Sequence, residues 1–171
     1  MSLSMYQATV PMFVRSLQNL RHVLEKGESH AKAVNIAPQA LLESRLIDDM
    51  LPLVRNVQIA TDMAKNGSAR LAAVEPLKFD DNETTFAELY ARIDRAIDYV
   101  NTFAPVLIDG SETRKITIRS GSDELNYQGM AYLTDFLLPN FFFHCTTSYA
   151  ILRKAGVELG KKDFLGMQPR T

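Results

Sequence analysis

The 171-residue sequence contains a single cysteine, Cys145, so no disulfide can form within the chain and nothing indicates an oxidising compartment. Its 19 basic and 20 acidic residues leave a formal net charge of -1, which gives no electrostatic footprint for nucleic acid or an anionic membrane. No uninterrupted apolar run approaches the roughly 20 residues that span a bilayer, and the first residues lack the basic start and apolar core of a signal peptide. These absences favour a cytoplasmic protein with neither nucleic acid nor membrane as a partner.

Several catalytic signatures are also absent. The sequence has no glycine-rich phosphate loop, no CxxC motif, no paired-carboxylate signature and no Ser-His-Asp order. It has no internal repeat and no low-complexity segment. With 46% hydrophobic and 23% charged residues, its composition predicts one globular domain over residues 1–171.

Four segments show the three-to-four-residue apolar spacing of amphipathic helices. They cover about residues 4–26, 52–74, 85–100 and 132–155. Pro11 is expected to kink the first turns of the first helix. Small residues such as Gly67 imply that another helix closely approaches the second one. The third helix opens with a capping box, Thr85 and Glu88, and the fourth ends at Gly156.

The connections between these segments contain two shorter elements. Pro38 begins a short extra helix between the first and second helices. Ile116 and Ile118 alternate with polar residues before a Ser-Gly-Ser turn at 120–122, which predicts a small β-hairpin over 115–127. The sequence therefore predicts an all-α bundle with one extra short helix and one small β-hairpin between the third and fourth helices.

The connection over residues 75–84 bears on the topology of the bundle. A helix of 22 residues is about 33 Å long, and ten extended residues span about 33–36 Å. This connection is just long enough to return along the second helix and to start the third helix parallel to it. An up-down-down-up arrangement is therefore permitted.

His144 follows three phenylalanines on an apolar helix face, and two interpretations of it stay open. A hydrogen-bonded core histidine is the commoner outcome at such a position, whereas a metal ligand or general base would be a working group. A helical zinc pair needs a second histidine four residues on, but Ser148 stands there. Cys145 points about 100° away from His144 around the helix, so we interpret it as a small buried hydrophobe.

Other polar candidates lie on other segments. Gln58 stands beside the apolar stripe of the second helix, with Asp62 four residues on, a spacing typical of a flanking polar row. His30 follows Gly27, where the first helix is expected to break. His30 is therefore predicted to be a polar loop residue, with the alternative that it folds over one end of the bundle.

Three long stretches carry a family resemblance. They are "LLESRLIDDMLPLVRNVQIATDMAKNGSARLA", "TFAELYARIDRAIDYV" and "LPNFFFHCTTSYAILRKAGVELGKKDFLG". They closely resemble a bacterial family known only as a domain of unknown function, which is placed among the DinB/YfiT-like proteins that are often described as metalloenzymes. The resemblance implies an up-down-down-up four-helix bundle and a homodimer.

The metal site of that superfamily looks like one histidine on the second helix and a His-x-x-x-His pair on the fourth. Matched residue by residue, these positions fall approximately on Gln58, His144 and Ser148, and only His144 keeps an imidazole. The resemblance therefore implies a degenerate metal site. No cofactor is expected, and a divalent metal, zinc or nickel, is the alternative.

Three functions follow as hypotheses. The first is a pocket that binds an unknown small molecule or performs a catalytic step with His144 as acid or base. The second is a noncatalytic homodimer, which is favoured by three successive phenylalanines that one core can hardly absorb. The third is a divergent metal-dependent transferase or hydrolase with His144, His30 and either Asp49 or Asp62 as ligands. The other residues expected to line the pocket are Gln58, Asp62, Tyr149 and His30.

Overall fold

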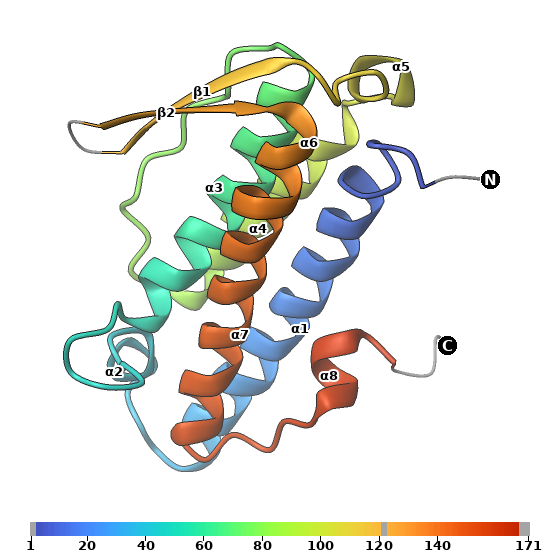
Figure 1. The fold of residues 1–171 in the computed structure, drawn as a ribbon. Coiled ribbons are helices and arrows are strands. Elements are labelled where there is room, and N and C mark those ends of the chain that lie inside the picture. Colours follow the sequence, from blue (N-terminus) through green and yellow to red (C-terminus); the bar gives the residue numbers. More distant parts are fainter. Residues whose placement is uncertain (1–2, 121–122, 168–171) are drawn as a thin grey trace.

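The computed structural model describes residues 3–120 and 123–167 as a mostly helical chain with one small antiparallel sheet (Figure 1). Its elements are α1 (Val10–Ala33), α2 (Pro38–Leu42), α3 (Leu53–Leu71), α4 (Phe86–Asn101), α5 (Pro105–Ile108), β1 (Lys115–Ser120), β2 (Asp123–Gln128), α6 (Gly129–Ala131), the π-helical turn η1 (Tyr132–Leu137), α7 (Leu138–Lys154) and α8 (Lys161–Leu165). None of the helices in the described part has the length and apolar content needed to span a bilayer.

Helix α1 begins and ends later than the predicted range of 4–26. The residues before it form a separate turn, in which the Thr9 hydroxyl donates to the Met5 carbonyl at 2.8 Å. Pro11 lies in the first turn of α1, where a backbone N–H would have no helical partner. Pro11 therefore starts the helix, and the prediction that it kinks the helix was wrong.

Gly27 does not break α1, contrary to the prediction. A Cβ at this position would lie 2.8 Å from Cδ2 of Leu152 on α7, so the missing side chain allows close contact between the two helices. The helix continues to Ala33 and includes His30. The prediction of a loop histidine at position 30 was therefore wrong.

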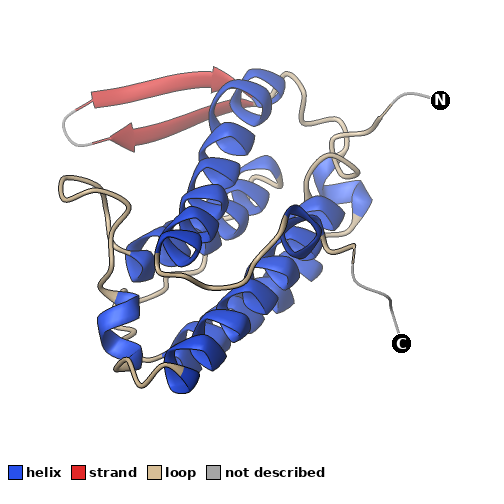
Figure 2. Cartoon of the chain, turned by 90° about the horizontal axis from the view of Figure 1, so that it is seen from below, coloured by secondary structure: helices blue, strands red, loops and turns tan. Residues whose placement is uncertain are grey.

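The short predicted elements are present. Helix α2 begins at Pro38, as predicted. Strands β1 and β2 pair in antiparallel register, and Ile116 and Ile118 are buried. Their turn was predicted at 120–122, and residues 121–122 lie outside the described residues. Figure 2 shows the hairpin at one edge of the helices.

The last long helical segment contains a wide turn that the sequence pattern did not indicate. Residues of α6, η1 and α7 follow one another without a loop, and η1 is π-helical. Pro139 accounts for this turn, because it has no N–H to donate to the carbonyl of Asp135 and its ring would clash with that carbonyl. The segment ends just before Gly156, as predicted.

Helix α3 packs against both α7 and α4, whereas α1 packs more extensively against α4 than against α7. The predicted close approach to α3 is confirmed: a Cβ on Gly67 would lie 2.5 Å from Leu137 of η1. Phe13 of α1 and Phe141 of α7 meet edge to face, with ring centroids 4.8 Å apart. The limited contact between α1 and α7 leaves a cavity between them.

The linker over residues 72–85 runs back along α3. Arg55, near the start of α3, makes an ion pair of 2.7 Å with Asp81, near the end of the linker. Lys65, further along α3, donates to the carbonyl of Leu77, near the start of the linker. The linker is therefore antiparallel to α3.

The same linker also runs antiparallel to α4. Arg92, in the first half of α4, makes an ion pair of 3.0 Å with Glu83. The hydroxyl oxygen of Tyr99, near the end of α4, lies 3.5 Å from the carbonyl oxygen of Glu75. The predicted capping box of Thr85 and Glu88 starts α4 near the end at which α3 also starts.

Candidate functional site

The side chain of His144 lies between α7 and α3, where it bonds to Asn56. The distance from His144 Nδ1 to Asn56 Oδ1 is 2.9 Å. The Asn56 amide nitrogen donates to the carbonyls of Leu51 at 3.0 Å and Pro52 at 2.9 Å, so its oxygen must face the imidazole. We therefore assign the proton to Nδ1 of His144, which donates to Asn56. This assignment leaves the Nε2 lone pair available.

His144 is buried, with 9% of its surface exposed. Burial lowers its pKa below the ordinary value of 6.5, because desolvation disfavours the imidazolium. The ring of Phe143 lies edge-on to it, with centroids 5.2 Å apart. Within the described residues Nε2 makes no hydrogen bond, yet it is not fully enclosed. His144 is thus a neutral imidazole that can accept one proton or one hydrogen bond at Nε2.

Ser148 lies one turn after His144, but its hydroxyl does not point to the imidazole. Ser148 Oγ donates to the carbonyl oxygen of His144 at 2.8 Å, as serines inside helices commonly do. Its side chain is fully buried. The hydroxyl at the third expected metal position is therefore occupied by the main chain.

Gln58 and His144 do not come together in the structure. Gln58 Nε2 donates to Glu83 at 2.8 Å, and its Oε1 accepts from Arg55 at 2.6 Å. Gln58 stands two residues after Asn56, which corresponds to about 200° around the helix. Asn56 is the residue of α3 that meets His144, whereas Gln58 faces the linker.

Asp62 belongs to the same hydrogen-bond and ion-pair network as Gln58. The buried guanidinium of Arg92 is the centre of this network. Arg92 Nη2 lies 3.0 Å from carboxylate oxygens of both Asp62 and Asp81, and Nη1 lies 3.0 Å from Glu83. Its Nε donates to the hydroxyl of Thr61 at 2.7 Å. This network joins α3, α4 and the linker, and its donors and acceptors are used within the fold.

The three expected metal positions do not fit the three-histidine site of the superfamily. Of Gln58, His144 and Ser148, only His144 offers a nitrogen ligand, Gln58 faces away from it, and the Ser148 hydroxyl bonds to the main chain. Asp49 is exposed in the loop before α3. Within the described residues, no three His, Cys, Asp or Glu side chains form a group that could hold a metal ion.

His30 lies in another part of the molecule. It lines an open hollow between α1 and the segment after α7, where Nε2 approaches the backbone at Gly156. The side chain is half-buried. Tyr149 lies elsewhere again, so the residues expected to share one pocket are divided among four places.

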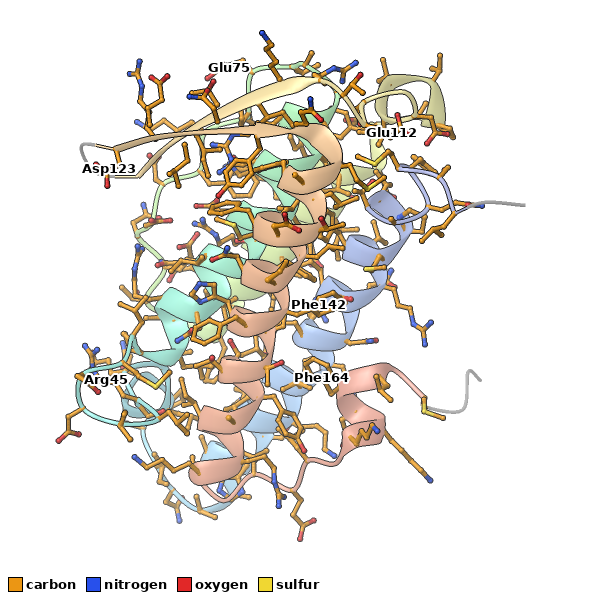
Figure 3. All side chains as sticks on the ribbon, in the orientation of Figure 1. Arg45, Glu75, Glu112, Asp123, Phe142 and Phe164 are labelled. Carbon is orange, nitrogen blue, oxygen red and sulfur yellow. The ribbon has the colours of Figure 1, made fainter. Side chains whose placement is uncertain are left out.

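Tyr149 lines a cavity of about 440 Å³ between α1, α7 and α8. This cavity lies on the side of α7 that faces α1, away from the contact of His144 with α3. Figure 3 shows Phe142 and Phe164 in the space between these helices. The apolar part of its lining comprises Pro11, Met12, Leu20, Val23, Phe142, Cys145, Tyr149, Phe164 and Leu165.

The polar lining of this cavity comes mainly from α1. Gln7, Arg15, Ser16 and Asn19 contribute side chains, and among the described residues Arg15 is the only charged one in the lining. Burial raises the pKa of the Cys145 thiol well above its ordinary value of 9.0, so the thiol is protonated and is a poor nucleophile. The lining suits binding better than thiol chemistry.

Helix α8 forms one wall of the cavity and is held to α1 by side chains. Arg15 donates to the carbonyl of Leu165 at 3.0 Å, and Asn19 donates to that of Phe164 at 3.1 Å. These two bonds satisfy carbonyls at the end of α8, which have no partner within so short a helix. The sequence pattern did not predict α8, since five residues show no periodicity.

An ionic contact also holds α8. Asp163 lies 3.1 Å from both His22 Nε2 and Lys26 Nζ of α1. Burial alone would raise the pKa of Asp163, but hydrogen bonds from the Gly160 backbone, His22 and Lys26 lower it to about 2. Asp163 is therefore a carboxylate at neutral pH and anchors α8 to α1.

Comparisons with known proteins agree with this architecture. Residues 5–165 match the model of a domain of unknown function, DUF1993. The chain is 38% identical to a crystal structure of a DinB family member protein from Shewanella denitrificans, with a TM-score of 0.86 over 97% of this chain and 94% of that chain. No curated protein matches the chain.

Proposed function

The chain belongs to the DUF1993 family within the DinB-like superfamily, and we propose that it binds a small, largely apolar molecule between α1, α7 and α8. The observation that carries this proposal is the cavity of about 440 Å³ at the junction of these helices. Pockets for small molecules commonly measure about 300–1,000 Å³ and combine an apolar lining with a few polar groups. The cavity has both properties.

The proposed ligand has an apolar body and one anionic group. Phe142, Tyr149 and Phe164 supply aromatic surface for the body. Arg15 supplies the positive charge, and its guanidinium keeps donors beyond the one bonded to Leu165. A guanidinium pairs well with a carboxylate or a sulfonate.

A tryptophan substitution that fills the cavity tests this proposal, and the unmodified chain has no tryptophan. The probe is 8-anilinonaphthalene-1-sulfonate, an aromatic anion. Ser16→Trp places an indole in the cavity and should abolish binding, whereas Gln18→Trp, on the exposed face of α1, should leave binding unchanged. Calorimetry should find one site on the unmodified chain. Equal binding by both variants would overturn the proposal.

The pairing of Arg15 with an anionic group of the ligand is tested separately. Arg15→Gln should weaken binding of the anionic probe about tenfold and leave binding of the neutral N-phenyl-1-naphthylamine nearly unchanged. Equal loss for both probes would contradict the assignment of the anionic group to Arg15. The apolar part of the proposal would then still be tested by Ser16→Trp.

A second candidate function is an acid–base site at His144. What favours it is the Asn56 bond, which holds the imidazole in one tautomer with Nε2 available. We propose no resident metal at this position, because the neighbouring Asn56 and Ser148 groups are engaged in other bonds. Elemental analysis of purified protein tests this: near-stoichiometric zinc or nickel that is lost in His144→Ala would favour the metal-dependent alternative.

We also infer that α1, α3, α4 and α7 form an up-down-down-up four-helix bundle of the DinB type. The linker over residues 72–85 supports this, since it is antiparallel to both α3 and α4.

Homodimerisation is a further proposal. Phe143 supports it, because this side chain is 55% exposed while that of Phe141 is buried. Light scattering that gives a monomer mass up to millimolar concentration would contradict it.

A further inference from the structure

A second hollow lies at the other end of the molecule from α8, between β1 and the end of α3. It has a volume of about 800 Å³ and is lined by Arg70, residues 73–76 and residues 114–119. Figure 3 shows Glu75 beside the hairpin at this end. Neither the cavity behind α8 nor the His144 contact shares a residue with this hollow.

The hollow follows the free edge of β1. The sheet in the described residues has two strands, so β1 pairs with β2 on one side only. Residues of β1 line the hollow and residues of β2 do not, which places the hollow on the unpaired side. A strand edge of this kind offers backbone N–H and C=O groups to an added strand.

The lining of the hollow is basic, although the whole chain carries a formal net charge of -1. Arg70, Arg114, Lys115 and Arg119 face one lining carboxylate, Glu75. Positive charge is therefore concentrated beside the strand edge.

Two of these arginines are fixed by the fold. Arg114 donates to the carbonyl of Leu71 at the end of α3, and Arg70 Nη1 donates to the hydroxyl of Tyr132 at 3.2 Å. Each guanidinium has five N–H donors, so both retain donors for a further acceptor. They are pre-positioned positive charges and need little ordering when an anion binds.

The side chains of β1 alternate in a way that suits a strand partner. Ile116 and Ile118 are buried, so Lys115 and Arg119 stand with Thr117 on the opposite, exposed face. Residues two apart on an added strand have the same spacing and would stand beside this row. Alternate acidic residues on the partner would then meet Lys115 and Arg119.

From this geometry we propose that the edge of β1 binds an extended acidic peptide segment as a third strand. Backbone hydrogen bonds supply the pairing, and the basic residues select the acidic side chains. A second copy of this chain does not suit the site, because pairing β1 with β1 would bring Lys115 and Arg119 of both copies together.

The test uses a fluorescent peptide of alternating glutamate and threonine with the full chain. We expect binding with slower hydrogen exchange at the β1 amides. The double variant Lys115→Glu, Arg119→Glu should bind at least about tenfold more weakly, whereas Lys161→Glu, Lys162→Glu on α8 should bind as the unmodified chain does. A peptide of alternating lysine and threonine should not bind.

Two further arms separate strand pairing from charge alone. An acidic peptide of the same charge with proline at alternate positions cannot donate the pairing hydrogen bonds and should bind at least about tenfold more weakly. Equal binding of the proline peptide, or complete displacement by equimolar inorganic tripolyphosphate, would overturn the proposal in favour of a simple anion site. Dimerisation that the double variant abolishes, without peptide binding, would overturn it in favour of a second copy.

Discussion

Nδ1 of His144 lies 2.9 Å from Oδ1 of Asn56, and this contact joins α7 to α3 across the interior. Asn56 is itself held by two carbonyls at the start of α3. The histidine is therefore placed by an amide whose orientation cannot reverse without losing three hydrogen bonds. This relationship decides both the protonation of His144 and its contribution to stability.

Acidification should remove a part of the stability that depends on His144. Because its folded pKa lies below 6.5, the unfolded chain binds more protons than the folded chain between the two pKa values, so stability falls as pH falls through that window. Urea unfolding of the unmodified chain and of His144→Gln should show a difference in unfolding free energy that shrinks from about pH 7 to about pH 5. A difference that is constant with pH would contradict the buried, neutral imidazole.

Asp163 should contribute in a lower pH range and with the same sign. Its pKa falls from 3.8 to about 2 on folding, so its stabilisation is present above about pH 4 and is lost as pH falls towards 2. Asp163→Asn should cost about 2 kcal/mol near neutral pH, as a shift of this size implies. Asp98→Asn, at an exposed position of α4, is the matched control and should change little. Equal effects of the two substitutions would contradict the anchoring of α8.

Arg92→Met should destabilise the fold strongly. The substitution leaves Asp62, Asp81 and Glu83 close together without their shared cation, and breaking such a buried network costs about 3–5 kcal/mol. The control is Arg95→Met, because Arg95 is exposed and its guanidinium carbon lies 3.7 Å from the Phe79 ring centroid. It should cost less than about 1 kcal/mol. Chemical denaturation measures both, and a similar cost for the two would argue against the network.

The contact of Gly67 with Leu137 predicts a coupled pair of substitutions. Gly67→Ala should cost about 1–3 kcal/mol, because the added methyl meets the Leu137 side chain. Leu137→Ala removes that obstacle, so the double variant should be more stable than the sum of the single effects indicates. Strictly additive unfolding free energies would show that the two positions do not touch.

Much of the helical framework could be predicted from periodicity and capping, as Thr85 with Glu88 illustrates. The ends of α1 could not be predicted in this way, because the effect of a proline or glycine on a helix depends on the residues around it. Pro11 does not disturb the helix, because it lies in the first turn. Gly27 leaves space for the side chain of Leu152, which lies 125 positions later in the sequence. The π-helical turn before Pro139 is a similar local response that the spacing does not reveal.

The site was harder to predict because its contacts are tertiary. Spacing placed His144 on an inner face but could not distinguish Asn56 from Gln58 as its partner on α3. Arg92 could have been found, since it is three residues from Leu89 on the apolar stripe of α4 and is an unusual residue there. The cavity depends on α8, which is held by the contact of Asp163 with His22 across the chain.

The most direct test of the proposed function is a crystal structure of the chain with 8-anilinonaphthalene-1-sulfonate. We expect the aromatic rings to lie between α1, α7 and α8, beside Phe142 and Tyr149, with the sulfonate at Arg15. A saturated complex in which the probe lies elsewhere and this cavity contains no probe would contradict it.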